Sequence, residues 1–335
     1  MANNKQEYIE VQHKTAFVTG ASGFIGRHLI RDLLENNYTV TALVLPGEAT
    51  PPNWGSQVRT VEGDIRALNS LANEIGAFDV VFHLAAIVSD WGGLQEHIDI
   101  TVTGTSNAIE LALQNDAHFI VTTSVCAYAS SLAKGYITEN TPLGKPASNY
   151  EFCKQEQERV TQKAVSQHNL KASIVRPGNV YGVDSGPWVN TLVDMMRQSK
   201  PVLIGSGDWD AGLVHVKNLV QIMLLIADSN YVKGDIFLGS DGFGITWKTY
   251  IKALSRIAKT KEPKHVPNQV ARLLAPVLEW HGKLTRRAER PLITRQAYRL
   301  TGGANEFSTV KARQCLGYEP SVSFEQAIEE LESHF

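Results

Sequence analysis

The stretch Thr19-Gly20-Ala21-Ser22-Gly23-Phe24-Ile25-Gly26 decides the fold of this chain. It follows a β-branched run and precedes an amphipathic stretch, so it predicts a strand, a glycine turn and a helix. Gly20 and Gly23 permit a tight turn and let backbone N–H groups approach a pyrophosphate at the helix N-terminus, while Gly26 permits close helix–strand packing. A glycine cluster alone would more simply be a plain turn. The flanking strand and helix favour a dinucleotide-binding loop.

The rest of the first half repeats this alternation of short β-branched runs and amphipathic stretches. Such alternation predicts an α/β fold with a doubly wound parallel sheet, the Rossmann arrangement, and helices on both faces. The expected strands are Thr15–Thr19, Thr39–Leu45, Gln57–Val61, Val80–His83, Phe119–Thr123 and Ala172–Val175, and the expected helices are Gly23–Glu35, Asn69–Ile75, Gln95–Gln114 and Tyr150–Gln167.

The alternation loosens after Pro177. Further on, we expect helices at Val189–Arg197 and Trp247–Ala258, a helix ending at Asp228, and a strand at Asp235–Leu238. We therefore predict a dinucleotide-binding domain over residues 12–176, with residues 212–240 returning to it. Residues 177–211 and 241–335 are expected to form a smaller, mixed substrate-binding lobe.

Composition excludes several function classes. The 335 residues carry 32 basic and 34 acidic side chains, a net charge of −2, which argues against a nucleic-acid partner. One basic run stands out, and we interpret it first as a solvated face and second as a contact for anions or lipid headgroups; it comprises Lys283, Arg286, Arg287, Arg290, Arg295 and Arg299. The polar first residues and the lack of an apolar run of roughly 20 residues predict a cytoplasmic protein without a transmembrane segment.

Cysteine usage points to a reducing compartment. Cys126, Cys153 and Cys315 are few, odd in number and far apart in the sequence. This pattern fits free thiols rather than a disulfide framework or a zinc site. We expect no metal.

Tyr150 and Lys154 are the candidate catalytic pair. Four residues apart on a helix, their side chains emerge on one face. An adjacent ammonium favours the phenolate, and moving a phenol pKa from about 10 to about 7 takes roughly 4 kcal/mol. We expect Lys154 and an oxidised nicotinamide to supply this jointly, so that Tyr150 exchanges a proton with a reacting oxygen. Ser124, after a predicted strand, is placed to hydrogen-bond that oxygen, although a turn serine bonded to its own backbone is the simpler alternative.

Two further strand ends are candidate cofactor contacts. Asp64 and Ile65 follow the third strand, where they would read an adenine edge; the alternative is that Asp64 caps the next helix. Leu84, Ala85 and Ala86 follow the fourth strand, and their size suits backbone contact with a cofactor. For the preceding His83 we expect a packed, hydrogen-bonded role.

The second strand bears on the choice between NAD and NADP. An acidic residue that holds the ribose diol of NAD usually sits at its end, roughly 20 residues past the glycine loop. Here the segment is Ala42-Leu43-Val44-Leu45-Pro46-Gly47-Glu48, with no acid at the strand end. Glu48 would have to reach back, whereas Arg27 would meet a 2′-phosphate. We expect NADP, with NAD as the alternative.

Together these residues resemble the extended short-chain dehydrogenase/reductase family over nearly the whole chain. The matching segments are TGASGFIG (19–26), GDI (63–65), VFHLAA (81–86), VTGTSN (102–107), TTSVCAY (122–128), YEFCK (150–154) and VRPGNVYG (175–182). The resemblance implies Ser124, Tyr150 and Lys154 as catalytic residues. It implies a cofactor site formed by Gly20, Ser22, Gly23, Phe24, Ile25, Gly26, Arg27, Asp64, Ile65, Leu84, Ala85, Ala86, Thr122, Tyr150, Lys154, Pro177, Gly178, Asn179 and Val180.

Two positions depart from the family pattern. Members commonly carry an asparagine at the position of Thr101, where it helps to hold a proton-relay water. Nucleotide-sugar epimerases usually have an arginine where this chain has Asp210 and Ala211. Since a guanidinium is the best partner of a diphosphate, this second departure argues against a nucleotide-sugar substrate.

The C-terminal part is similar to the 3β-hydroxysteroid dehydrogenase-like branch. The similar segments are Ser89–Gly93, Arg290–Thr294, Phe307–Arg313 and Leu316–Pro320. This resemblance implies oxidoreduction of a secondary alcohol or ketone on a bulky apolar substrate, of steroid or 3-oxo acyl type. The aromatic residues Trp91, Trp188, Trp209, Phe243 and Trp247 suit an apolar pocket, or equally a core.

Several alternatives stay open. They are a dihydroflavonol-reductase-like carbonyl reductase, a nucleotide-sugar epimerase or dehydratase, and a dinucleotide sensor without activity. The family suggests a homodimer built on the helices of residues 95–114 and 150–167. The amphipathic stretch Val270–Trp280, which we expect Pro276 to interrupt, is either a lid, a membrane contact or, more simply, packed against the main domain.

Overall fold

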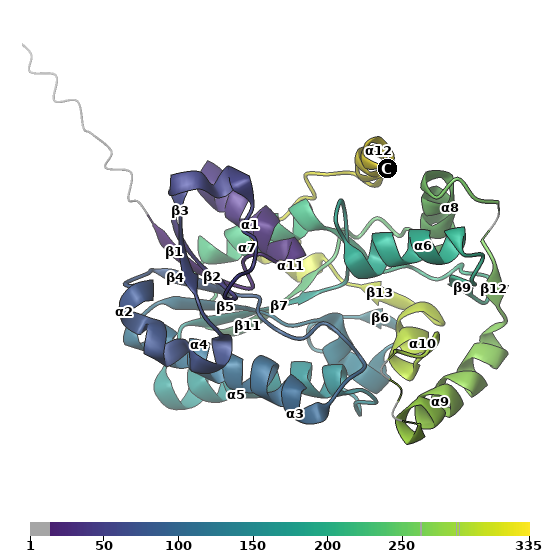
Figure 1. Cartoon of the computed structure of the whole chain (residues 1–335), viewed down its shortest axis with the longest axis horizontal. Coiled ribbons are helices and arrows are strands. Elements are labelled where there is room, and N and C mark those ends of the chain that lie inside the picture. The colour runs from purple at the N-terminus through teal and green to yellow at the C-terminus, as the bar shows by residue number, and fades with distance from the viewer. Residues whose placement is uncertain (1–13, 262, 286, 288) are drawn as a thin grey trace, which may run out of the picture.

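A seven-stranded parallel sheet forms the centre of the molecule (Figure 1). The computed structural model describes residues 14–261, 263–285, 287 and 289–335, so the N-terminal polar segment and Arg286 lie outside the described residues. The strand order is β11-β7-β5-β4-β1-β2-β3. Their bounds are β1 (Thr15–Thr19), β2 (Thr39–Val44), β3 (Val58–Glu62), β4 (Val80–His83), β5 (His118–Thr122), β7 (Ala172–Pro177) and β11 (Lys233–Gly239). The predicted doubly wound sheet is confirmed.

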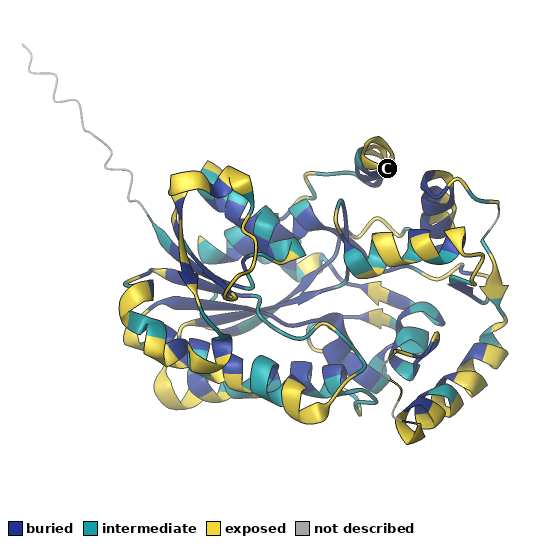
Figure 2. Cartoon of the chain, in the orientation of Figure 1, coloured by how far each residue is buried: buried dark blue, intermediate teal, exposed yellow. Residues whose placement is uncertain are grey.

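Helices cover both faces of this sheet, because each face presents apolar side chains that must be buried. One face carries α1 (Phe24–Glu35), α7 (Val216–Ala227) and α11 (Val310–Leu316). The other carries α4 (Gly104–Gln114), α5 (Asn149–His168), the short η2 (Ile65–Leu71) and α2 (Ala72–Ile75). The central strands β1, β4, β5 and β7 are almost entirely buried between the two layers (Figure 2).

The helix expected over residues 95–114 has an irregular centre. It runs through α3 (Leu94–His97), the wide π-turn η3 (Ile98–Thr103) and α4 without leaving the helical path. Such π-turns are rare and are frequent at functional sites. Here the turn contains Thr101, whose Oγ1 accepts a hydrogen bond from the backbone N–H of Ile87 (3.2 Å), just after β4.

A second group of elements lies beyond the carboxyl ends of the strands (Figure 1). It comprises β6 (Gly135–Ile137), β8 (Asn179–Tyr181), η5 (Gly186–Asn190), α6 (Thr191–Arg197), β9 (Leu203–Ile204), β10 (Leu213–His215), α8 (Trp247–Ile257), β12 (His265–Val266), α9 (Asn268–Leu284), α10 (Arg295–Thr301), β13 (Asn305–Phe307) and α12 (Phe324–His334). The small two-stranded sheets β10–β8, β12–β9 and β13–β6 join its segments. α11 leaves this group and packs on the main sheet, where Lys311 Nζ donates to the carbonyl of Ile236 (2.8 Å). The division into two domains stays a prediction.

Helix α9 continues through Pro276, so the expected interruption there is wrong. Proline removes one N–H and crowds the carbonyl four residues earlier, which belongs to Arg272. Both residues lie on the solvent side of the helix, where a carbonyl without its helical partner is open to solvent. No helix among the described residues has both the length and the apolarity needed to cross a bilayer.

Candidate active site

The glycine loop joins β1 to α1 and approaches the end of β4. Gly20 has a φ of +66°, and a side chain there would meet the backbone N of Ala85 at 2.9 Å. A side chain at Gly26 would meet the carbonyl oxygen of Gly20 at 2.3 Å, so this position packs the helix against the loop. The structure therefore brings Gly20, Gly26 and Ala85 together, as the sequence predicts.

The N-terminus of α1 fits a phosphate group. Gly23 is exposed, no side chain caps the helix, and its first turn contains no acidic residue. The first backbone N–H groups of a helix lack partners within it and favour negative charge. Ser22, Phe24 and Ile25 flank this position and are only partly buried. These residues fit the pyrophosphate of a dinucleotide cofactor.

A chain of buried hydrogen bonds runs from the end of β1 to α5. Thr19 Oγ1 contacts His83 Nδ1 (2.8 Å), and His83 Nε2 contacts Thr105 Oγ1 (2.9 Å). Gln157 Nε2 donates to the same Thr105 oxygen (2.9 Å), and Lys154 Nζ donates to Gln157 Oε1 (2.9 Å). Burial lowers the pKa of His83 to about 3, so the imidazole is neutral. The packed, hydrogen-bonded role predicted for His83 is confirmed.

Lys154 is buried at the carboxyl end of β5. Its Nζ donates to the carbonyl of Thr122 (3.1 Å), the last residue of β5, as well as to Gln157. Burial lowers the pKa of Lys154 to about 8. An ammonium has three N–H donors, so one remains beyond these two bonds. The same Nζ lies 5.7 Å from the centroid of the Tyr150 ring.

Tyr150, in the first turn of α5, is buried beside Ser124 and Cys126. Burial raises the pKa of its phenol, and the neighbouring Ser124 hydroxyl partly opposes this effect. The residues of the chain therefore do not by themselves lower the pKa of Tyr150 toward about 7. Lys154 directs two of its donors to Thr122 and Gln157 instead of to the phenol. The phenol rests in its protonated form.

Ser124 serves the local turn as well. It follows β5 and begins η4 (Val125–Ser131), where its Oγ accepts from the backbone N–H of Cys126 (3.1 Å). The turn role named as an alternative for Ser124 is thus present, and binding of a reacting oxygen beside Tyr150 stays a prediction. Both roles are compatible, since a hydroxyl has one donor and two acceptor sites.

A buried ion pair supports the same end of the sheet. Arg176 in β7 pairs with Glu158 in α5 (2.6 Å), and both side chains are at least 95% buried. Arg176 also donates to the hydroxyl of Tyr128 (2.8 Å), while Thr123 Oγ1 donates to Glu158 (2.8 Å). A buried pair persists only when its remaining donors and acceptors are satisfied, and here they are. The pair fixes α5 against β5 and β7.

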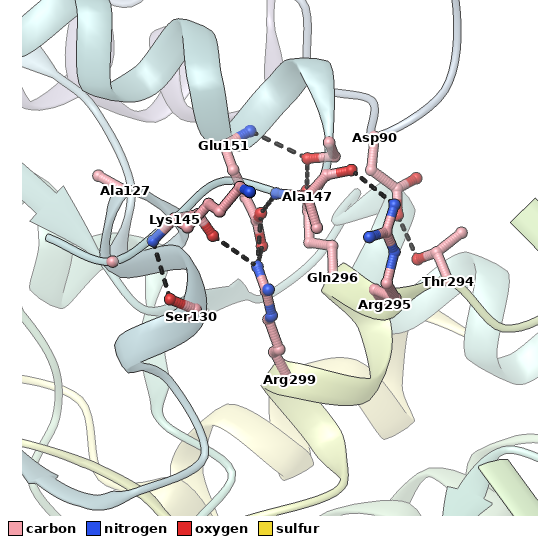
Figure 3. A network of polar contacts seen from close by, with 12 residues as sticks. Asp90, Ala127, Ser130, Lys145, Ala147, Glu151, Thr294, Arg295, Gln296 and Arg299 are labelled. Carbon is pink, nitrogen blue, oxygen red and sulfur yellow. Dashed lines mark hydrogen bonds and ion pairs between the residues drawn. The ribbon is translucent and has the colours of Figure 1, made fainter. Parts of the chain in front are cut away.

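The C-terminal segment clamps the start of α5 (Figure 3). Arg299 in α10 pairs with the fully buried carboxylate of Glu151 (2.8 Å), which also accepts from the backbone N–H of Ala147. Ser148, the N-cap of α5, donates to Gln296. Nearby, Asp90 accepts from Arg290 and Thr294. Tyr150 therefore lies in a turn held by residues almost 150 positions later in the chain.

The residues predicted to contact the adenine and its ribose already have partners within the chain. Asp64 caps η2 through the backbone N–H of Arg66 (2.8 Å) and pairs with its guanidinium, while Ile65 is buried against Gly104. The capping alternative for Asp64 is thus what the structure contains. Glu48 turns back to accept from the backbone N–H of Leu45 (3.2 Å). Arg27 is partly buried, and its guanidinium reaches Asp184 at 3.4 Å.

The chain passes from β7 to β8 through Pro177, Gly178, Asn179 and Val180. A side chain at Gly178 would meet the carbonyl oxygen of Gly212 at 2.3 Å, so this backbone crossing requires glycine. Asn179 Nδ2 donates to the carbonyl of Ala211 (2.6 Å). These residues lie at the carboxyl edge of the sheet, beside the ends of the strands that carry Thr122 and Gly239.

The aromatic residues divide between core and site. Trp247 is buried and packs against Trp188, with ring centroids 5.4 Å apart. Trp188 is only partly buried and also packs against the cluster that contains Tyr150. Trp91 donates from Nε1 to the carbonyl of Arg287 (2.9 Å). Trp209 and Phe243 are exposed.

Two features of the candidate site could not be predicted from the sequence. Gln157 stands in the run Gln155-Glu156-Gln157-Glu158, which is typical of a solvated helix face, yet Gln157 and Glu158 are buried. The pairing of Glu151 with Arg299 joins segments so distant in sequence that no local pattern indicates it. The spacing of Gln157 three residues after Lys154 was the only available signal.

Comparison with known proteins identifies the family. Residues 16–238 match the NAD dependent epimerase/dehydratase family. The chain belongs to this family. The predicted membership is confirmed, and the protein is an NAD(P)-dependent enzyme of the extended short-chain dehydrogenase/reductase type.

Curated relatives match the 3β-hydroxysteroid dehydrogenase-like branch. The chain is 28% identical over 323 residues to 4-hydroxy-2-methyl-3-oxo-4-farnesyl-3,4-dihydroquinoline-1-oxide ketoreductase of Stigmatella aurantiaca, covering 94% of this chain and 95% of that protein. It is 26% identical to the mouse (Mus musculus) sterol-4-alpha-carboxylate 3-dehydrogenase, decarboxylating, covering 96% and 91%. It is also 26% identical to the 3-beta-hydroxysteroid dehydrogenase of Mycolicibacterium neoaurum, covering 93% and 89%.

Solved structures agree with the fold. UDP-glucose 4-epimerase of Thermotoga maritima superposes with a TM-score of 0.75 at 22% identity, covering 96% of this chain and 98% of that one. The dTDP-glucose 4,6-dehydratase DesIV of Streptomyces venezuelae, solved with NAD bound, gives a TM-score of 0.75 at 22% identity, covering 95% and 96%. At such identity the likeness extends to the fold alone.

Proposed function

We propose that this enzyme interconverts a secondary alcohol and a ketone on a bulky apolar substrate, with Tyr150 as the acid and base. The observation that carries the proposal is the buried group of Ser124, Tyr150 and Lys154 at the carboxyl edge of the sheet. A bound nicotinamide would supply or accept the hydride. The residues of the chain then have to hold the reacting oxygen and move one proton.

Each of the three side chains has a part in this proposal. Ser124 lies beside Tyr150 and would bind the reacting oxygen together with it. Tyr150, protonated because burial raises its pKa, starts the reduction in the state that gives a proton to that oxygen. Lys154, with one donor left, would hold a ribose hydroxyl and place positive charge beside the phenol.

The surroundings of Tyr150 support the proposal of an apolar substrate. Partly buried Trp188 packs beside it, and Val88, exposed after β4, lies next to the residues proposed to contact the cofactor. Asp210 accepts from the backbone N–H of Gly212 (2.7 Å), where nucleotide-sugar enzymes usually have an arginine. A carboxylate there opposes a diphosphate. The names of the relatives, a farnesylated-quinoline ketoreductase and sterol dehydrogenases, agree with this substrate class.

We propose that the residues predicted to contact the cofactor form its binding site. NADP(H) is preferred because the partly exposed Arg27 lies at the start of α1, whereas the Glu48 carboxylate accepts from the backbone N–H of Leu45. The partner of the enzyme is then a small apolar molecule. A homodimer through α4 and α5 stays a family-based prediction.

The test follows reduced-cofactor absorbance with a panel of 3-oxosteroids, 2-alkyl-3-oxo acids, small ketones and sugar nucleotides. We expect turnover with a bulky apolar member and a loss of about 100-fold or more in Tyr150→Phe. Tyr136→Phe is the matched control, because Tyr136 is an exposed tyrosine on β6. Turnover confined to small ketones or aldehydes would favour the dihydroflavonol-reductase-like alternative. Epimerisation of a sugar nucleotide without net cofactor consumption would contradict the proposal.

A further inference from the structure

Helix α9 packs on the protein through a narrow face of small residues. Ala271, Ala275 and Gly282 are buried, and the first two pack in a cluster with Ile204 and Ile293. Glu279, on the same face, is buried and pairs with Arg295 (2.6 Å). Helix α9 contacts the cluster around Ile204 and Ile293 through this side.

The opposite side of α9 is exposed and apolar except for His281. Six side chains there have exposed fractions of 40–71%: Val270, Leu273, Leu274, Val277, Trp280 and Leu284. At 3.6 residues per turn they fall within roughly one third of the helix circumference. The exposed side of a surface helix ordinarily carries polar residues. Figure 2 shows α9 at the edge of the molecule with its outer side exposed. An apolar stripe of this length indicates a binding surface.

Positive charge borders this stripe. By helical spacing, Arg272 and Lys283 lie on one flank of α9, about 60–80° around the helix from the nearest residue of the stripe, and Arg287 follows the helix; all three are exposed. Within the described residues none of the three forms an ion pair, and Glu279, the one acid in α9, is buried against Arg295. A helix with an apolar face that includes tryptophan and with a basic edge is the form that lies in the surface of an anionic bilayer.

The C-terminal end of α9 adjoins the proposed active site. The ring of Trp91 lies against Gly282, and its Nε1 donates to the carbonyl of Arg287. One residue further, the carbonyl of Gly92 accepts from the side chain of Asn149 (2.9 Å), which immediately precedes Tyr150. A surface bound by α9 would thus lie on the same side of the molecule as the loop that borders Tyr150.

We propose that α9 docks this enzyme on an anionic lipid surface, with the stripe of six apolar residues in the interface and Arg272, Lys283 and Arg287 against the headgroups. The helix lies on the surface and does not span the bilayer. The proposed docking surface is separate from the catalytic group. The docking proposal therefore stands or fails independently of the proposed reaction.

The test is co-sedimentation of the full chain with vesicles of phosphatidylcholine alone and of phosphatidylcholine with phosphatidylglycerol. We expect binding to the anionic vesicles, lowered roughly tenfold or more by Leu273→Ser with Trp280→Ser and by Arg272→Glu with Lys283→Glu. The matched controls are Leu143→Ser with Val310→Ser, which are exposed apolar positions elsewhere, and Lys200→Glu with Lys252→Glu. Circular dichroism verifies that each variant is folded, and Trp280→Phe identifies the fluorescence change of that indole on binding.

Three results would overturn the proposal. One is the absence of binding to either vesicle by folded protein. Another is equal binding to neutral and anionic vesicles, which would remove the role of the basic edge. The third is a concentration-dependent dimer, measured by light scattering without lipid, that the variant pair at Leu273 and Trp280 abolishes, since the stripe would then be covered by a second copy.

Discussion

Lys154 Nζ donates a hydrogen bond to Gln157 Oε1, 2.9 Å away and one turn further along α5. This contact links the proposed catalytic lysine to Thr105, His83 and Thr19, and so to the start of the glycine loop. The proposed cofactor loop and the proposed proton-transfer group are thereby fixed to one another through the interior.

Replacing Gln157 by leucine should weaken the hold on Lys154. Because burial already lowers the pKa of Lys154 to about 8, losing an acceptor should lower it further and move the alkaline loss of activity to lower pH. A hydrogen bond to a charged group contributes about 1.5–3 kcal/mol, so we expect kcat to fall about tenfold or more. The pH dependence of kcat measures both effects.

Gln157→Glu should act in the opposite direction, since a carboxylate favours the ammonium and raises the pKa of Lys154. Gln162→Leu, further along α5 and bonded to the carbonyl of Gly234, is the matched control. If Gln157→Leu and Gln157→Glu left the alkaline limb where the unaltered enzyme has it, Gln157 would have only a structural role.

Arg27 should distinguish the two cofactors. A partly exposed guanidinium at the start of α1 would contact a 2′-phosphate, which NAD lacks. We expect Arg27→Leu to raise KM for NADP about tenfold while KM for NAD changes little. The measurement is KM for both cofactors in each variant, with Arg31→Leu as the control one turn away. Equal changes for both cofactors would contradict the proposed preference for NADP.

Arg299→Leu should loosen the start of α5. It leaves the buried carboxylate of Glu151 without its cation, and breaking such a pair costs about 3 kcal/mol. Burial already raises the pKa of Glu151, and Arg299 opposes that rise. Urea unfolding gives the cost, which should be much smaller in a Glu151→Gln background. The same cost in both backgrounds would show that Arg299 acts through another contact.

Asp241 should make stability depend on pH. It is buried and accepts from the backbone N–H of His215 (2.9 Å) and from Asn218 (2.8 Å), and burial raises its pKa to about 7. A carboxyl whose pKa is raised by folding stabilises the fold when protonated, so this contribution is present below about pH 4 and is lost as the pH rises through about 7.

Asp241→Asn should therefore flatten the fall in unfolding free energy between about pH 4 and about pH 7. Asp208→Asn, at an exposed carboxylate, is the comparison. An unchanged pH dependence in Asp241→Asn would mean that the folded protein keeps Asp241 ionised.

The sequence predicts the sheet well because its signal is local. Short apolar, β-branched runs predict the strands ending at Thr19 and His83, and a parallel sheet then brings their ends together. The continuous path of α9 through Pro276 was missed, since its stability depends on packing against α10 and on a solvent-facing carbonyl. The contacts of Gln157 and Arg299 were missed for a similar reason: they depend on which distant elements meet, and no periodicity reports that.

The central claim is that this enzyme reduces or forms a carbonyl by direct exchange of hydride with a nicotinamide cofactor, with Tyr150 handling the proton. The most direct measurement supplies reduced cofactor carrying deuterium at the transferable position, with a 3-oxosteroid or a 2-alkyl-3-oxo acid, and analyses the product by mass spectrometry. The account predicts an alcohol with deuterium on its carbinol carbon, and none above background in Tyr150→Phe. No deuterium in either product, together with epimerisation of a sugar nucleotide by the same preparation, would contradict it.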